Sequence, residues 1–160
     1  MISFIFIITG APNSYAQTSF TLNAQTGDAK LDMTLKNINI EAQESIPGFI
    51  SNVSLDYGVP KAKIEDLIFN VKMSPADVYM TIGIAKIIKK PIEIVIEEYK
   101  INKNKGWGKI AKNLGIKPGS KAFHELKKGG IIELEKMKDK SKGKGKGKKK
   151  SDEVKKKRKK

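Results

Sequence analysis

Prolines recur at regular intervals through the middle of the chain, and they constrain its fold more than any other feature. Pro47, Pro60, Pro75, Pro91 and Pro118 each precede or open a stretch in which apolar residues recur at steps of three and four. Proline is tolerated in the first turn of a helix, where its missing N–H would have no partner anyway, but it breaks a helix interior. The spacing therefore predicts short helices, each beginning close to one of these prolines.

Between residues 45 and 130, six stretches of the chain have apolar residues spaced to form one face of a helix. In chain order their apolar positions are Ile46, Phe49, Ile50, Val53 and Tyr57; Ile64, Leu67, Ile68 and Val71; Val78, Ile82, Ala85 and Ile88; Ile92, Val95, Ile96 and Tyr99; Trp107, Ile110, Ala111 and Leu114; and Phe123 and Leu126. Ser74 and Asp77 occupy the two positions of a capping box, with aspartate in place of the usual glutamate. We predict an all-α fold, a compact bundle of about five to six short helices at residues 45–130.

The first 16 residues carry the pattern of a secretory signal peptide. An apolar run at residues 2–8 is followed by a glycine, a proline and then Ser14-Tyr15-Ala16, which places small residues at the −3 and −1 positions of a cut after Ala16. No lysine or arginine precedes the run, so the usual positive start is missing, and a buried strand or helix of the domain is the alternative. We favour the signal peptide, which predicts a periplasmic or secreted protein.

Residues 17–44 are expected to form a flexible leader and an arm. Residues 17–29 are mostly small and polar, which is typical of a flexible segment. Leu31, Met33 and Leu35 alternate as in a strand, whereas Leu35, Ile38 and Ala42 follow helical spacing, so residues 30–44 fit either structure. We expect a short ordered arm that packs on the domain.

The last helix is expected to stop at Gly129-Gly130, and residues 131–160 to form a disordered, polycationic Lys/Gly-rich C-terminal tail. Residues 136–160 hold 15 basic and 3 acidic side chains, whereas residues 1–135 hold 17 basic and 14 acidic ones. Almost nothing apolar is present in this segment to offset the entropy of ordering it. The predicted polyanion-binding residues are Lys142, Lys144, Lys146, Lys148, Lys149, Lys150, Lys155, Lys156, Lys157, Arg158, Lys159 and Lys160.

The segment from residue 106 to residue 126 supports two interpretations. A helix that ends at Gly115 is followed by a turn and a second helix capped by Ser120, which is the order of elements in a helix-turn-helix. Ser120 and Lys121 would then read bases, but residues 45–130 contain no arginine, the residue that most often contacts guanine. We therefore favour a helical hairpin held by structural anchors. These anchors are Trp107, Ile110, Leu114, Phe123 and Leu126.

The same segment carries a family resemblance. The run GWGKIAKNLGIKPGSKAFHELKKG, with LDYGVP and SPADVYM upstream, resembles a family of small exported bacterial all-helical proteins of unassigned function. The similarity covers about residues 45–130, and its specific part is the GWGxIAKxLGIxPGS signature. The resemblance implies a helical periplasmic or secreted module that often ends in a glycine- and lysine-rich segment, and it transfers no catalytic residue.

Composition argues against an enzyme. The chain has no cysteine and a single histidine, His124, which excludes thiol chemistry, disulfides and multi-histidine metal centres. His124 and Glu125 are adjacent, so on a helix they point about 100° apart and are poorly placed to hold a ligand together. Glu93, Glu97 and Glu98 form the densest acidic group, for which a solvated helix face is the favoured interpretation. We expect no catalytic, metal or cofactor site and no small-molecule substrate.

These observations favour a non-enzymatic exported helical module. Its polycationic tail would attach it to anionic surfaces or polymers of the cell envelope, such as a lipid surface, an envelope polymer or nucleic acid. The alternative is an intracellular helix-turn-helix protein that binds nucleic acid and uses the tail as a non-specific clamp. A carboxylate-based enzyme such as a glycan hydrolase is the least favoured, because no carboxylate pair stands out.

Overall fold

The computed structural model describes the backbone of residues 20 and 23–157, and the side chains of that part as far as Asp139. Within it the fold is all-α, as the sequence predicts. The elements are α1 (Ala29–Glu44), α2 (Ile46–Tyr57), α3 (Lys61–Phe69), α4 (Pro75–Ile88), α5 (Ile92–Asn102), the 3₁₀ helix η1 (Lys103–Lys105), α6 (Gly106–Asn113) and α7 (Lys121–Lys157). The signal peptide predicted at residues 1–16 lies outside the described residues.

The six helices expected from the proline punctuation correspond to α2 through α7. The starts of α2 and α4 are capped by serine side chains. The Ser45 hydroxyl accepts a hydrogen bond from the backbone N–H of Gly48 at 3.2 Å at the start of α2. At the start of α4, the Ser74 hydroxyl accepts from the Asp77 N–H and the Asp77 carboxylate accepts from the Ser74 N–H, which completes the predicted capping box.

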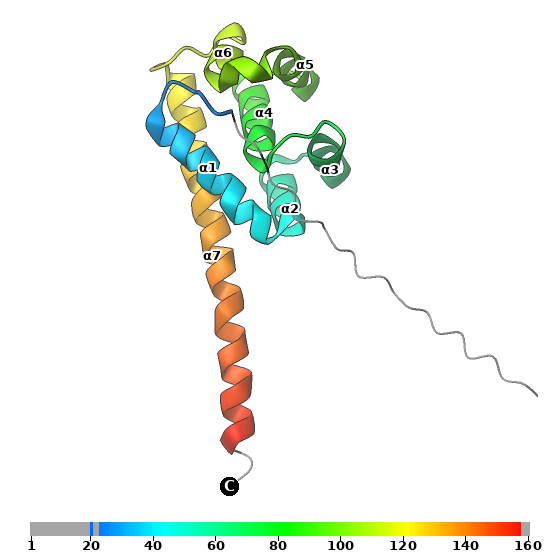
Figure 1. The fold of residues 1–160 in the computed structure, drawn as a ribbon, viewed down its shortest axis with the longest axis vertical. Helices are drawn as coiled ribbons and strands as arrows, with labels where there is room; N and C mark the ends of the chain where they lie inside the picture. The colour runs from blue at the N-terminus through cyan, green and yellow to red at the C-terminus, as the bar shows by residue number, and fades with distance from the viewer. Residues whose placement is uncertain (1–19, 21–22, 158–160) are drawn as a thin grey trace, which may run out of the picture.

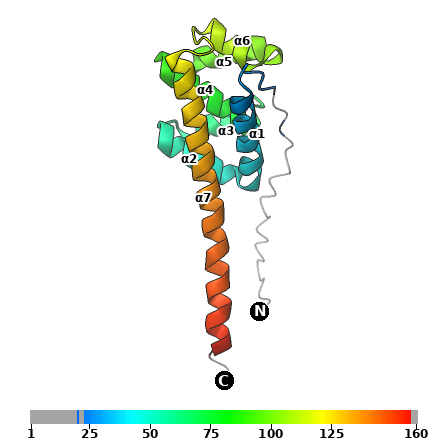
Figure 2. The same ribbon diagram turned by 90° about the vertical axis from the view of Figure 1, so that its left-hand side faces the viewer.

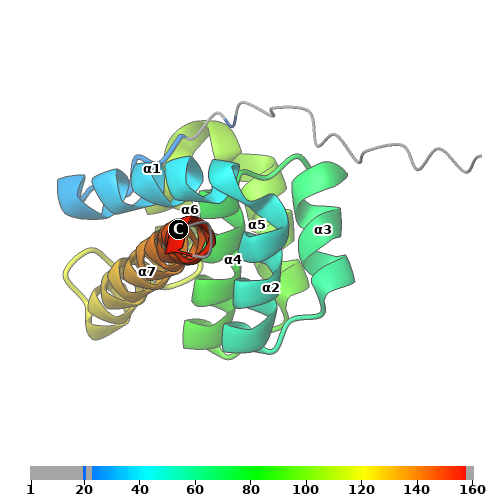
Figure 3. The same cartoon turned by 90° about the horizontal axis from the view of Figure 1, so that it is seen from below.

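Helix α4 forms the centre of the bundle (Figure 1). It packs against α1, α2, α3, α5 and α7, and each of its residues from Pro75 to Ala85 is buried. A helix that is apolar around its whole circumference is suited to such a position. Helices α1 and α7 lie together on one side of α4, and α2 and α3 lie on the other side (Figure 3).

The segment that fits either a strand or a helix is α1, and it belongs to the core. Leu31, Leu35, Ile38 and Ala42 are fully buried along one helical face. Met33 is 66% exposed, so its alternation with Leu31 and Leu35 does not report a strand. The prediction that residues 17–44 lie outside the helical domain is therefore wrong for this part, because the apolar face of α1 is packed against α4 and α7.

Gly129 and Gly130 do not end α7, so the predicted stop at these residues is wrong. A Cβ atom at Gly129 would lie 2.8 Å from the hydroxyl of Tyr79, and one at Gly130 would lie 3.4 Å from Thr34. The two glycines form a notch that lets α7 approach α4 and α1 closely, and through it Tyr79 donates a hydrogen bond to the carbonyl oxygen of Leu126 at 2.6 Å. This packing offsets a cost of about 1 kcal/mol for glycine inside a helix.

The folded domain also extends beyond residue 130. Met137 is 7% exposed and packs on the core, so the tail boundary predicted at residue 131 is wrong by at least seven residues. Further along, α7 leaves the bundle and runs to Lys157 with no other helix beside it (Figures 1 and 2). Disorder of the Lys/Gly-rich segment stays a prediction, since the side chains from Lys140 onward are outside the described part.

Candidate functional site

A buried carboxylate, Asp77, organises the polar contacts at the centre of the bundle. Its Oδ1 accepts a hydrogen bond from the indole N–H of Trp107 at 2.8 Å. Its Oδ2 accepts from the N–H and the hydroxyl of Ser74, at 3.0 and 2.8 Å, and from the hydroxyl of Tyr99 at 3.2 Å. Asp77 lies in the first turn of α4, where the helix dipole favours a negative charge. One side chain thus joins α4, α5 and α6.

The Asp77 network is suited to holding structure rather than to chemistry. Asp77 is 4% exposed, and both of its oxygens accept hydrogen bonds. Burial and the nearby carboxylate raise the pKa of Tyr99 above its ordinary value. The rings of Tyr99 and Trp107 are stacked, with centroids 5.4 Å apart. These groups therefore fix the position of α6 against α4 and α5.

The five predicted anchors lie on α6, the following connection and the first turns of α7. Trp107 and Leu126 are 1% exposed, Ile110 is fully buried and Phe123 is buried, whereas Leu114 is half-buried at the edge of the core. The sequence located this cluster but not the bond from Trp107 to Asp77. The capping-box position of an acid gives no indication that an indole 30 residues later will bind the same side chain.

The geometry of the same segment disfavours a helix-turn-helix. The connection from α6 to α7 covers residues 114–120, whereas the motif uses a turn of about three to four residues. Helix α7 packs mainly on α1 and α4. Ser120 caps α7 by accepting a hydrogen bond from the N–H of Phe123 at 3.2 Å, and Lys121 is exposed.

The glycines on both sides of Trp107 allow another part of the chain to cross α6. The N–H groups of Trp107 and Gly108 donate to the carbonyl oxygens of Ala24 and Gln25, at 2.7 and 2.9 Å. Donors in a first helical turn have no partner within the helix, so these contacts satisfy them. A Cβ atom at Gly108 would lie 2.7 Å from the Gln25 oxygen, and Gly106 has a φ of +76°. Residues 23–28, named the strap here, therefore require glycine at both positions.

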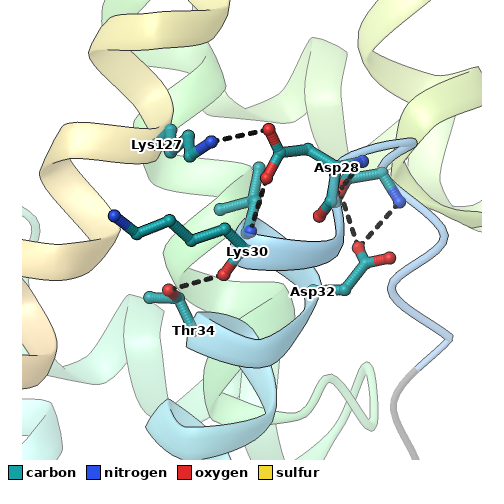
Figure 4. A network of polar contacts seen from close by, with 7 residues as sticks. Asp28, Lys30, Asp32, Thr34 and Lys127 are labelled. Atoms are coloured by element: carbon teal, nitrogen blue, oxygen red, sulfur yellow. Dashed lines mark hydrogen bonds and ion pairs between the residues drawn. The ribbon is translucent and has the colours of Figure 1, made fainter.

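The strap is held by polar contacts to α1 and α7 (Figure 4). The N–H and the hydroxyl of Thr26 donate to Asp32, at 3.0 and 2.6 Å. Asp28 caps α1 by accepting from the N–H of Leu31 at 2.9 Å, and it binds the ammonium group of Lys127 at 2.6 Å. The bonds from Lys127 and Leu31 hold the pKa of Asp28 below its ordinary value. The expectation of a flexible leader is wrong for the strap, whose only sequence signal is the pair of glycines around Trp107.

A groove of about 280 Å³ lies between α7 and the helices α2 and α4. Lys136 on its rim binds Asp56 at 2.7 Å, and the ammonium group of Lys86 lies 5.3 Å from the centre of the Tyr57 ring. Burial is the main cause that raises the pKa values of Tyr57 and Tyr79, which line the groove. The ion pair between Lys136 and Asp56 joins α7 to α2, and the hydrogen bond from Tyr79 to Leu126 joins α4 to α7. The side chains that line the groove therefore hold α7 against the bundle.

The other candidate residues of the sequence lie apart from one another. All twelve predicted polyanion-binding residues lie in the part of α7 and the C-terminus whose side chains are not described. His124 is exposed. In the acidic group, Glu93 pairs with Lys63 of α3 at 3.2 Å, and Glu98 accepts a hydrogen bond from the side-chain amide of Asn113 on α6 at 2.6 Å. Two members of this group therefore connect α5 to its neighbours.

No group of three or more potential metal ligands occurs within the described part of the chain. None of the described helices is both long enough and apolar enough to cross a membrane. Comparisons with protein-family models, with curated proteins and with solved structures find no significant match to this chain. The function is therefore argued from the chain's own charge distribution and geometry.

Proposed function

We propose that this protein is a non-enzymatic exported helical module whose polycationic tail attaches it to anionic surfaces or polymers of the cell envelope. One observation carries the proposal: most of the net positive charge of the chain lies in its last 25 residues, and the residues before them are nearly neutral as a whole. Residues 136–160 hold 15 basic and 3 acidic side chains, whereas residues 1–135 hold 17 and 14. The binding residues proposed are the eleven lysines from Lys142 to Lys160 and Arg158.

The direction of α7 supports this division. Helix α7 begins inside the bundle, where Phe123, Leu126 and Met137 are buried, and then projects away from it (Figures 1 and 2). The chain that carries most of the net charge thus starts from a fixed point on the domain and extends outward. A partner of the tail would reach it without rearranging the bundle.

The chemistry of lysine makes the attachment strong in total but unselective. A lysine near an anionic membrane surface contributes about 1 kcal/mol, and a lysine bound to a phosphate polymer releases condensed counterions. Lysine is a point charge without the planar fork of arginine, so it recognises charge density rather than a particular base or headgroup. Attachment of this kind weakens steeply as the salt concentration rises.

A pair of variants changed at the same six positions, one losing the charge and one keeping it, tests the attachment. In one full-length variant the six lysines at positions 142, 144, 146, 148, 149 and 150 are replaced by glutamine, and in the control they are replaced by arginine. We expect the glutamine variant to leave immobilised heparin at clearly lower salt than the wild type, and the arginine control to elute with the wild type or later. Elution of the glutamine variant at the wild-type salt concentration would refute attachment through the tail.

Export is tested separately, by the mass of the protein isolated from its native source. The resemblance of the GWG segment to exported helical proteins and the small residues before position 17 both support cleavage after Ala16. The expected mature chain begins at Gln17, which leaves the strap at residues 23–28 complete. A native protein that retains Met1 would contradict export and leave the charge argument to be tested on its own.

A further inference from the structure

A second group of lysines lies at the end of the bundle opposite to the one from which α7 projects. From Lys103 to Lys128 the chain has eight lysines and a single acidic residue, Glu125, whereas the rest of residues 1–135 has nine basic and thirteen acidic side chains. Residues 1–135 are therefore nearly neutral as a whole, although their positive charge is concentrated between residues 103 and 128. The lysine-rich segment comprises η1, α6, the connection after it and the start of α7, which gather at one end in Figures 1 and 2.

Seven of these lysines are exposed, and the six that lie between residues 103 and 121 are named the basic end here. They are Lys103, Lys105, Lys109, Lys112, Lys117 and Lys121. The ion pairs between described residues use Lys63, Lys127 and Lys136, and none of the six. Their charges thus face solvent without a carboxylate in salt-bridge contact.

Two lysines of the basic end lie on α6 itself. Lys109 and Lys112 are three residues apart in this helix, which places them on one face, and Lys105 ends η1 directly before the helix. The opposite face carries Trp107 and Ile110, which the Asp77 network and the core hold in place. Like charges that share one face of a helix repel each other. An anionic partner would remove this repulsion.

We propose that the basic end is a second binding surface, separate from the tail, and that it binds a linear polymer of phosphate groups. Its lysines spread over η1, α6, the connection and α7, so they suit a chain of repeated anionic groups better than one small anion. Contacts from lysine to phosphate fix position and carry little sequence information. Binding at this end is therefore independent of the order of monomers in the polymer.

A polymer fits the basic end better than a membrane does. Proteins that lie on a bilayer commonly insert apolar or aromatic side chains beside their lysines. The large apolar side chains exposed in the described part are Met33, Ile40, Leu55, Phe69, Ile94, Ile101 and Ile132, and all of them lie outside residues 103–128. Within that segment the two large aromatic side chains, Trp107 and Phe123, are buried. Ile101, 76% exposed, lies two residues before Lys103, so the basic end presents six exposed lysines with a single large exposed apolar side chain next to them in the chain.

Because the two basic regions lie on opposite sides of one domain, one molecule binds two anionic partners at the same time. The basic end binds a phosphate polymer, and the tail binds a second polymer or a surface. The rest of residues 1–135 carries more acidic than basic side chains, so contact with a polyanion is favoured at the lysine-rich segment and at the tail.

The salt dependence of binding to duplex DNA of arbitrary sequence, used as the phosphate polymer, tests the basic end in the full-length chain. The test variant is Lys105→Gln, Lys109→Gln and Lys112→Gln. The control is Lys36→Gln, Lys61→Gln and Lys90→Gln, which removes the same charge from exposed lysines elsewhere on the domain. Glutamine and lysine have similar helix propensities, so both variants should keep the fold, which circular dichroism checks.

We expect the slope of log affinity against log salt to become shallower by about 2–3 in the test variant, at about 0.9 per lost phosphate contact, and to stay unchanged in the control. Equal slopes for the two variants would overturn the proposal. A parallel titration with anionic lipid vesicles should show no difference between the two variants, and a matching loss there would overturn the choice of a polymer. Both variants keep every lysine of the tail, so failure here leaves the proposed function of the tail standing.

Discussion

Replacing Trp107 by phenylalanine and by alanine separates the two contributions that this side chain makes to stability. Phenylalanine keeps most of the buried apolar surface but removes the indole N–H, which binds the Asp77 carboxylate at 2.8 Å. Loss of a hydrogen bond to a buried charged group costs about 1–3 kcal/mol. Alanine also removes the ring, which is 1% exposed and stacked on Tyr99, and a buried large aromatic contributes about 3–5 kcal/mol.

The expected order of stability is therefore wild type, then Trp107→Phe, then Trp107→Ala. Because small domains are stable by only about 5–15 kcal/mol, Trp107→Ala should be partly unfolded or close to it. Urea denaturation followed by far-ultraviolet circular dichroism measures the free energy of unfolding without relying on tryptophan fluorescence. Tyr99→Phe is the matched control, since its bond to Asp77 is longer and the same oxygen also accepts from Ser74.

A double-mutant cycle completes this test. If the indole and the carboxylate bind each other, Trp107→Phe and Asp77→Asn together should cost less than the sum of the two single changes, by about 0.5–3 kcal/mol. Strict additivity would refute the Asp77 network. An unchanged stability of Trp107→Ala would show that the ring is a surface contact, and a binding role for it would then be the better explanation.

Three further outcomes are expected from the structure. Gly129→Ala should lower the melting temperature because its methyl group meets a tyrosine hydroxyl at 2.8 Å, whereas Gly130→Ala, at 3.4 Å, should be close to neutral; equal effects would contradict the notch. Because the folded pKa of Asp28 is lowered, its contribution is complete above about pH 4 and is lost as the pH falls below it, so Asp28→Asn should reduce the acid-induced drop in melting temperature. A chain that ends at Asp139 should melt within a few degrees of the full chain, because α7 beyond Met137 has no neighbouring helix; a large drop would show that the removed residues pack on the bundle.

Local signals predicted the six helices from α2 to α7 because each rests on features confined to a few neighbouring residues. The prolines at the start of five of the six apolar faces and the Ser74–Asp77 capping box depend on backbone chemistry within one turn. The burial of Trp107 followed from its place on the apolar face of α6. Such features need no knowledge of what packs against the helix.

The errors arose where tertiary packing overrides a local rule. Gly129 and Gly130 carry the ordinary signal of a helix end, but the close approach of Tyr79 to α7 requires glycine at position 129 and leaves only 3.4 Å to a Cβ atom at position 130. Met33 completed an alternating pattern in α1 although it lies on the exposed face. The strap consists mostly of small polar residues. It is held in place by N–H groups in the first turn of α6, which have no partner within that helix and lie more than 80 residues away in the chain. The basic end was hidden because net charge was summed over residues 1–135, in which thirteen of the fourteen acidic residues lie outside residues 103–128.

The most direct test of the account compares the full chain with the chain that ends at Asp139 in binding to duplex DNA at several salt concentrations. The account predicts tight, strongly salt-dependent binding by the full chain and weak binding by the shortened one, with no preference for a sequence in either case. The weak binding that remains should disappear when Lys105, Lys109 and Lys112 are replaced by glutamine. A shortened chain that bound as tightly as the full chain, or that selected one DNA sequence, would contradict the account.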